Sequence, residues 1–302
     1  MEESQSRHQQ ELTSFWYSGG EFRVIWKVSI YGSVAFFSLI VSYIGISQLF
    51  PWLPWRFGNP LAVLIAAVAA TIFCVRLIDR RSVLEMMGLQ LQRRAGRLLL
   101  YGIGLTLLML LLLLLLELLF ADARIFLSSV TLAHTLSLLF LGLLSFTLVG
   151  FAEEILVRGY PFLVLRAQIN TLTALLLTSG VFSLIHALNP GIGWIGFLNI
   201  FLAGIWLGIA RVRSGSLWLP VGLHIGWNFF MGPVFGFPVS GIIDRSTFIT
   251  QSEGPAWITG GTFGPEGGLL VTMVLLVGII VLYHPRLGAS RLHDEDAVSK
   301  KT

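Results

Sequence analysis

The chain has 302 residues, of which 55% are hydrophobic and only 12% are charged. A soluble domain normally carries about 25% charged residues, and a surface so poor in charge would not stay dispersed in water. The composition excludes an ordinary soluble globular protein and indicates a protein of the lipid bilayer. The net charge of +4 comes without a basic stripe interleaved with exposed aromatic residues, so we expect no nucleic-acid partner.

Eight hydrophobic segments follow one another along the chain. A helix needs about 20 mostly apolar residues to cross a hydrocarbon core of about 30 Å. We expect an all-α, polytopic transmembrane domain over residues 27–284, flanked by tails at residues 1–26 and 285–302. The eight predicted spans are residues 27–49, 60–78, 98–120, 135–156, 172–188, 194–210, 216–235 and 267–284.

Positive charge is distributed unevenly between alternate segments. With the N-terminus placed inside, 17 of the 20 Lys and Arg residues fall in inside segments, and only Arg56, Arg124 and Arg245 fall outside. Cytoplasmic segments of membrane proteins are enriched in Lys and Arg. We therefore expect both tails in the cytoplasm. The membrane that we expect for this integral protein is a bacterial plasma membrane.

The densest group of ionisable residues in a predicted span is Glu153 and Glu154, followed by Arg158. Such residues are costly in a membrane, by about 2.5–3.5 kcal/mol each on insertion scales, and they mark candidate sites. Residues four apart share a helix face, so Glu154 can pair with Arg158, whereas Glu153 is turned about 100° away. We expect one structural carboxylate and one that is free to act. The alternative is a helix end whose carboxylates simply reach water.

Two later spans carry further polar pairs. His186 follows Phe182 by four residues, and Asn228 follows His224 by four, so each pair shares a helix face. Taken alone, either histidine is also explained by a structural hydrogen bond between helices. Glu117, another carboxylate in a predicted span, has no motif around it and reads as a lone polar residue near an outer helix end.

Glu153 and His186 are equidistant from a polar turn that we expect at residues 167–171. In an antiparallel helix hairpin, such residues share a depth, here about 24 Å along each helix at 1.5 Å per residue. This requires the helix that carries Glu153 to continue to about Arg166. We expect both side chains to converge with the later histidine pair on one cavity open to the cytoplasmic side.

Three short motifs in this order, each near a different span, resemble the family of CAAX prenyl proteases and bacteriocin-processing or self-immunity proteins, the CPBP or Abi family. The resemblance covers about residues 130–235, the expected protease core. One departure is Val-Arg-Gly at residues 157–159, where many members have Phe-Arg-Gly. The matching positions are Glu153, Glu154, Arg158, Phe182, His186, His224 and Asn228.

The resemblance implies an intramembrane endopeptidase that acts on a peptide or membrane-protein substrate, which in the eukaryotic relatives is a prenylated C-terminal CAAX protein. It makes Glu153 the general base that activates a water with His186, and it assigns oxyanion stabilisation to His224 and Asn228. The other matched residues would support the site. Donors preorganised in a dry cavity can contribute several kcal/mol of transition-state stabilisation.

A metal cofactor is an alternative that the sequence leaves open. Glu153, His186 and His224 would form a suitable catalytic zinc set, but the His-Glu-x-x-His signature of many zinc proteases is absent. We expect a glutamate-activated water without a tightly bound metal.

Two non-protease functions also stay open. One is a non-enzymatic membrane immunity or scaffold protein. The other is a proton-coupled transporter, which the lack of an internal repeat disfavours. The substrate and the oligomeric state do not follow from the sequence.

Overall fold

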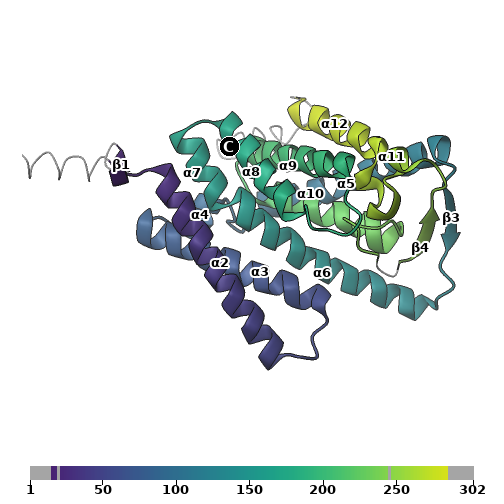
Figure 1. Ribbon diagram of the computed structural model, residues 1–302, viewed down its shortest axis with the longest axis horizontal. Helices are drawn as coiled ribbons and strands as arrows, with labels where there is room; N and C mark the ends of the chain where they lie inside the picture. The colour runs from purple at the N-terminus through teal and green to yellow at the C-terminus, as the bar shows by residue number, and fades with distance from the viewer. Residues whose placement is uncertain (1–14, 19–20, 244–245, 285–302) are drawn as a thin grey trace, which may run out of the picture.

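The computed structural model describes residues 15–18, 21–243 and 246–284, which form a helical bundle with two small two-stranded sheets (Figure 1). The α-helices are α2 (Val24–Leu49), α3 (Trp55–Phe73), α4 (Val83–Met87), α5 (Arg93–Phe120), α6 (Leu132–Arg158), α7 (Tyr160–Gln168), α8 (Thr171–Ile185), α9 (Trp194–Ser214), α10 (Trp218–Phe229), α11 (Ala256–Thr259) and α12 (Leu269–Tyr283).

Several shorter elements extend or connect these helices. The π-helices η1 (Cys74–Ile78) and η2 (Phe230–Val234) continue α3 and α10, and the 3₁₀ turns η3 (Gly261–Phe263) and η4 (Pro265–Gly267) precede α12. The strands are β1 (Tyr17–Ser18), β2 (Glu21–Phe22), β3 (Arg124–Leu127) and β4 (Phe248–Gln251), paired antiparallel as β1–β2 and β3–β4.

A helix lies at each of the eight expected span positions, but the helices differ in length. Five helical segments of the described residues are long and apolar enough to cross a membrane: Val24–Leu49, Trp55–Ile78, Arg93–Phe120, Leu132–Gln168 and Trp194–Ser214. Helices α8 and α12 have 15 residues each, which is about 22 Å at 1.5 Å per residue. The all-α membrane fold is confirmed, whereas the count of eight spans stays a prediction.

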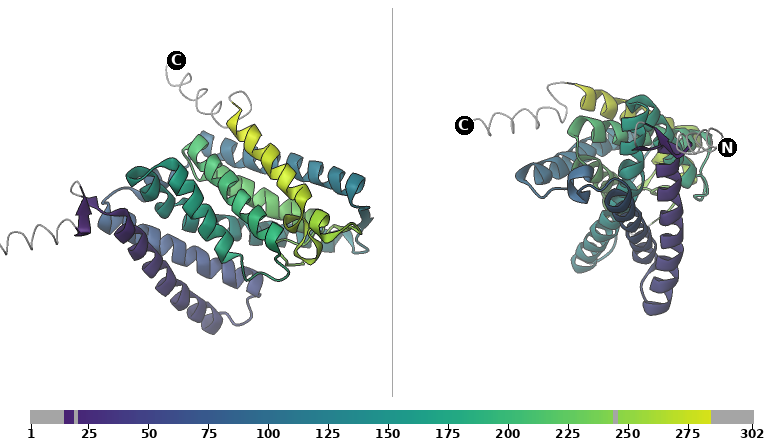
Figure 2. Two further views of the ribbon diagram at one scale, coloured as in Figure 1. Left: turned by 45° about the horizontal axis from the view of Figure 1, so that its top comes forward. Right: turned by 90° about the vertical axis from the view of Figure 1, so that its left-hand side faces the viewer.

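The helices form two groups (Figures 1 and 2). Helices α2 and α3 pack on each other and α3 packs on α6, while α10 packs against α5, α6 and α9. Glycines allow the closest of these approaches, because a Cβ on Gly222 of α10 would lie 2.3 Å from the Leu99 carbonyl oxygen of α5. Helix α6 lies between the group of α2 and α3 and the group around α10, so one of its faces packs against the buried helix α10.

Polar contacts tie several helix ends together at one end of the bundle. Lys27 Nζ lies 2.7 Å from Asp79 Oδ1, Arg94 Nη2 donates to the Ser214 carbonyl at 2.7 Å, and α4 lies among these helix ends. We call this the basic end, because the arginine-rich segments expected inside meet here. The β3–β4 sheet lies at the opposite end, on the right of Figure 1, and we call that the sheet end.

The helical segment that carries Glu153 runs from Leu132 to Gln168, past Arg166 as expected, with a break at Gly159. Helix α6 ends at Arg158 and α7 begins at Tyr160. Pro161, which has no N–H to donate back to α6, cannot continue the hydrogen-bond ladder. The expected turn at 167–171 is present, and the Asn170 side chain accepts a hydrogen bond from Thr173 N at 2.8 Å to cap α8.

Candidate active site

Glu153, His186, His224 and Asn228 line one cavity of about 560 Å³. Glu153 comes from α6, His186 directly follows the last residue of α8, and the other two come from α10. The apolar wall includes Phe146, Val149, Ile185, Trp206, Leu207 and Trp227. The structure thus brings together four residues that lie up to 75 positions apart in the sequence (153 to 228).

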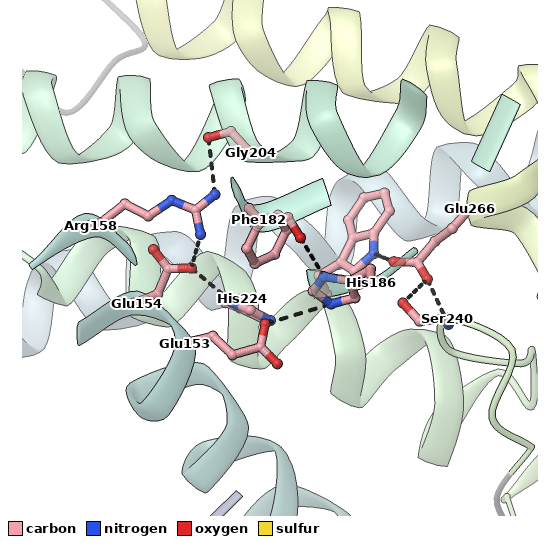
Figure 3. A network of polar contacts seen from close by, with 10 residues as sticks. Glu153, Glu154, Arg158, Phe182, His186, Gly204, His224, Ser240 and Glu266 are labelled. Atoms are coloured by element: carbon pink, nitrogen blue, oxygen red, sulfur yellow. Dashed lines mark hydrogen bonds and ion pairs between the residues drawn. The ribbon is translucent and has the colours of Figure 1, made fainter. Parts of the chain in front are cut away.

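The Glu153 carboxylate faces both histidine rings (Figure 3). Its Oε2 lies 3.8 Å from His186 Nε2 and 3.7 Å from His224 Nε2. Both distances exceed a direct hydrogen bond, and this oxygen accepts none from the described residues. The carboxylate and the two ring nitrogens therefore converge on a common point in the cavity without bonding to one another.

Glu154 and Arg158 form the ion pair that their spacing predicts, and both side chains are fully buried. Arg158 Nη1 donates to Glu154 Oε1 at 3.1 Å, and its Nη2 donates to the Gly204 carbonyl of α9 at 3.1 Å. The guanidinium carbon lies 4.1 Å from the ring centroid of Phe182. Arg158 thus links α6, α8 and α9 behind the cavity.

His224 is oriented by the same Glu154 oxygen. Its Nδ1 lies 2.9 Å from Glu154 Oε1. The carboxylate of an ion pair only accepts, so the proton of this bond is on Nδ1 and the ring directs Nε2 towards Glu153. Glu154 Oε1 therefore holds both the structural arginine and a site histidine.

His186 is oriented by the main chain of its own helix. Its Nδ1 lies 2.7 Å from the Phe182 carbonyl oxygen, and a carbonyl can only accept, so Nδ1 carries the proton. In the neutral ring, the Nε2 lone pair then faces Glu153. The Phe182 ring also lies against the His186 ring, with 4.7 Å between the ring centroids and an angle of 50° between the ring planes.

Asn228 lies one helical turn beyond His224 on the cavity wall. Its side chain is buried among the helices and makes no hydrogen bond with the other motif residues that the structure describes. Its amide is therefore available to a group that enters the cavity.

The cavity also contains a carboxylate that the sequence analysis did not identify. Glu266 of η4 accepts hydrogen bonds from Trp227 Nε1 at 2.9 Å and from both the Ser240 N–H and hydroxyl at 2.7 Å. It fastens the connection that follows α10 to the cavity wall. The signal that could have identified it is a lone glutamate among glycines, Gly264-Pro-Glu-Gly-Gly268, directly before an apolar helix.

Glu117 lies apart from this cavity, although its side chain is also fully buried. Both of its carboxylate oxygens lack a hydrogen bond from the described residues. This agrees with its interpretation as a lone polar residue near a helix end.

The side chains of Glu153, His186 and His224 are of the kinds that bind zinc, but they are not close enough together to form a metal site. No group of three or more His, Cys, Asp or Glu side chains in the described part of the chain is arranged to hold a metal ion. Glu153 and the two histidines come closest, and each Nδ1 bonds a protein acceptor, as is usual for histidine ligands. The glutamate-activated water without a tightly bound metal stays a prediction, with zinc as its alternative.

The cavity extends from Glu153 towards the sheet end and not towards the basic end. Besides the motif residues it is lined by Ser145, whose hydroxyl donates to the Arg56 carbonyl at 2.9 Å, and by Asn189 of the α8–α9 connection. On the basic side the site is closed by the buried Glu154 and Arg158. The expected opening of the cavity to the cytoplasmic side stays a prediction.

Comparison with known proteins bears on the segment that contains the site. The model of one family, described as Type II CAAX prenyl endopeptidase Rce1-like, matches residues 135–230. This segment includes all seven motif residues, and the match confirms the resemblance drawn from them. A search of curated proteins gives no match to the chain.

Proposed function

We propose, from the premise that residues 135–230 match the Rce1-like CAAX prenyl endopeptidases, that this chain is an intramembrane endopeptidase with Glu153 as its general base. One observation carries the proposal. An unbonded, buried oxygen of Glu153 faces the Nε2 atoms of two histidines in a largely apolar cavity between helices. A carboxylate in such surroundings is well placed to take a proton from a water.

In the first step, a water held between Glu153 and His186 attacks the carbonyl carbon of the scissile bond. Glu153 accepts one proton of the water, while the His186 Nε2 lone pair orients the other. The new C–O bond forms as the carbonyl π electrons move to the oxygen, which gives a tetrahedral oxyanion.

In the second step, His224 Nε2 and the Asn228 amide donate to the oxyanion. Because His224 Nδ1 already donates to Glu154, donation from Nε2 requires a doubly protonated ring. The Glu154 carboxylate, which accepts from Nδ1, stabilises that cation throughout, and the Glu153 carboxylate, 3.7 Å from Nε2, adds to this until it takes the proton of the water. The intermediate then collapses as the C–N bond breaks and the proton on Glu153 passes to the leaving amine.

We test the proposal by mass spectrometry of protein N-termini in membranes of cells that produce wild type, Glu153→Gln or Glu117→Gln. Glu117→Gln is the matched control, because it changes a buried carboxylate outside the cavity. We expect a set of new N-termini with wild type and Glu117→Gln that is missing with Glu153→Gln. Identical N-termini from all three proteins would contradict proteolysis and favour the non-enzymatic immunity or scaffold function.

A further inference from the structure

A second cavity, of about 440 Å³, lies at the basic end and shares no lining residue with the candidate active site. It lies between the start of α2, the end of η1 and one face of α7. The proposed protease chemistry uses none of its residues, so this cavity needs an explanation of its own. Charged side chains of both signs line it: Glu21, Lys27, Asp79, Arg80 and Arg81.

The floor of this cavity is a buried ion pair with one unused acceptor. The side chains of Lys27 and Asp79 are 6% and 9% exposed, and Lys27 Nζ lies 2.7 Å from Asp79 Oδ1. The other oxygen, Asp79 Oδ2, is buried and accepts no hydrogen bond from the residues that the structure describes. The Tyr160 hydroxyl, which does not line the cavity, is likewise without a hydrogen bond to any of them. Asp79 Oδ2 can therefore accept from a donor that enters the cavity.

The floor also carries an excess of negative charge. Lys27 Nζ lies 3.1 Å from Glu21 Oε2, so the carboxylates of Glu21 and Asp79 share one ammonium group. One further positive charge would balance the three side chains. A ligand with an ammonium group supplies that charge together with the N–H donor that Asp79 Oδ2 lacks.

The rim of the cavity has the opposite character. Arg80 and Arg81 lie in the connection between η1 and α4, and both are exposed. Neither guanidinium forms a salt bridge within the described part of the chain. The planar N–H fork of arginine fits two oxygens of a phosphate group. The rim therefore suits a phosphate, while the floor suits an ammonium.

The surroundings of the cavity indicate a ligand that belongs to the membrane. Leu77 is 64% exposed and lines the cavity together with Leu163 and Val164. Trp16, which is 40% exposed, packs on Trp26 of the first turn of α2 with 4.4 Å between the ring centroids. Tryptophan and arginine beside exposed apolar residues are typical of the boundary between hydrocarbon and water.

We propose that this cavity binds the headgroup of a phospholipid that carries a primary amine, a phosphoethanolamine group. The phosphate lies against Arg80 and Arg81, and the ammonium donates to Asp79 Oδ2. The acyl chains leave the cavity over Leu77. A choline headgroup has no N–H to donate, and a glycerol headgroup has no positive charge, so the cavity discriminates against both. This inference does not rest on the proposed function.

Lipid titrations of the purified full chain, followed by native mass spectrometry, test the choice of headgroup. Phosphatidylethanolamine, phosphatidylcholine and phosphatidylglycerol are compared with identical acyl chains. We expect phosphatidylethanolamine to bind at least about tenfold more tightly than either of the others, because a hydrogen bond to a charged group is lost with both. Equal binding of the three lipids, or tighter binding of phosphatidylglycerol, would overturn the inference.

A pair of variants tests the place of binding. The double change Arg80→Gln with Arg81→Gln should weaken phosphatidylethanolamine binding about tenfold or more, with a melting curve near wild type because both side chains are exposed. Arg76→Gln is the matched control, since this exposed arginine of η1 lies outside the cavity. An equal loss in the control would reveal general attraction to basic residues and overturn the site.

A soluble competitor distinguishes the lipid from a free metabolite with the same headgroup. O-phosphoethanolamine at the concentration of the lipid should displace little of it, because the competitor lacks the acyl chains that contact Leu77. If the soluble compound binds as tightly as the lipid, the ligand is a soluble amino phosphate and the assignment to a phospholipid is wrong.

Discussion

At the residue scale, two adjacent glutamates have opposite surroundings. Glu154 is fully buried and accepts bonds from Arg158 and His224, whereas Glu153 is one-quarter exposed to the cavity with a free oxygen. A turn of about 100° per residue is enough to place one carboxylate against helix neighbours and the other in the cavity. Substitution of Glu154 should therefore change the stability of the protein, whereas substitution of Glu153 should change its cleavage activity.

Glu154→Ala or Arg158→Ala should lower the free energy of unfolding by about 3–5 kcal/mol, because each leaves its partner as a buried unpaired charge. Glu153→Gln should leave the melting temperature near that of wild type and lower cleavage by about 10²–10⁴-fold, the usual contribution of a general base. Melting curves in detergent beside a cleavage assay check both. Equal destabilisation by Glu153→Gln and Arg158→Ala would refute this division of roles.

The double change Glu154→Gln with Arg158→Met should be more stable than either of its single changes. The glutamine oxygen can still accept from His224 Nδ1, and methionine fills the volume of the arginine stem without leaving a charge. The pair is measured by a double-mutant cycle on the melting curves. If the two single effects simply add, the two side chains do not act as a buried pair.

Removal of divalent metal should leave cleavage unchanged. The proposed chemistry uses a water held by Glu153 and His186, whereas a bound zinc ion would polarise the carbonyl and would take Glu153, His186 and His224 as ligands. The test is cleavage after dialysis against a strong chelator, together with elemental analysis of the purified protein. Activity that is lost on dialysis and restored by zinc would assign the chemistry to the metal.

The sequence predicts the motif residues well and the rest of the cavity poorly, for a physical reason. Helical periodicity and the hairpin turn place Glu154, Arg158 and His186 in the arrangement that the structure shows. Glu266 and Ser240 belong to connections without periodicity, and their meeting depends on how α10 and α12 pack. Local sequence contains no signal for such long-range contacts.

At the element scale, α8 and α9 pack closely enough to hold His186 and Arg158 in register. A Cβ on Gly204 of α9 would lie 2.8 Å from the Ser179 Cβ of α8. The Gly204 carbonyl also accepts from Arg158 Nη2. Gly204 therefore determines both how closely α8 and α9 approach and where the Arg158 side chain lies.

Gly204→Ala should destabilise the protein by about 1–3 kcal/mol through overpacking and should lower cleavage, because α8 must move with His186 at its end. Gly180→Ala is the matched control on α8, because a Cβ there meets nothing within 4 Å. Melting curves and cleavage should be close to wild type for this control. Two variants that behave alike would contradict the close-packing argument.

Hydropathy identifies the helices more reliably than it identifies their ends. In place of the expected span at 172–188, the structure has a 15-residue helix that ends at Ile185. His186 follows as its C-cap and lines the cavity. The expected span at 216–235 became α10 followed by the π-helix η2. At the first departure the His186 ring bonds the Phe182 carbonyl that a continuing helix would use, and at the second the π-helix contains Pro233, which has no N–H to donate.

At the scale of the whole molecule, charge separates the two ends. Arg94 and Arg211 bind carbonyl oxygens of neighbouring segments at the basic end, and Lys27 pairs with Asp79 there. Arg124 lies in β3 at the sheet end. The bundle therefore carries its orientation signal in the same residues that fasten its helix ends together.

Reporter fusions should place both termini in the cytoplasm, although residues 1–14 and 285–302 lie outside the described residues. A fluorescent protein that matures only in the cytoplasm should be bright at either end, and a phosphatase that is active only outside should be silent at both. A phosphatase signal at the C-terminus alone would require an odd number of spans. That result would remove one of the shorter helices, α8, α10 or α12, from the set of spans.

The double use of Glu154 Oε1 has an evolutionary consequence. Because the same oxygen accepts from Arg158 and His224, purifying selection on folding alone preserves the Glu154–Arg158 pair, and neutral drift cannot remove its members one at a time. Glu153 has no such protection if its substitution leaves the fold intact, as predicted above. Among descendants of this sequence, retention of the pair is therefore expected even where cleavage is lost, whereas retention of Glu153 would point to selection for the proposed catalysis.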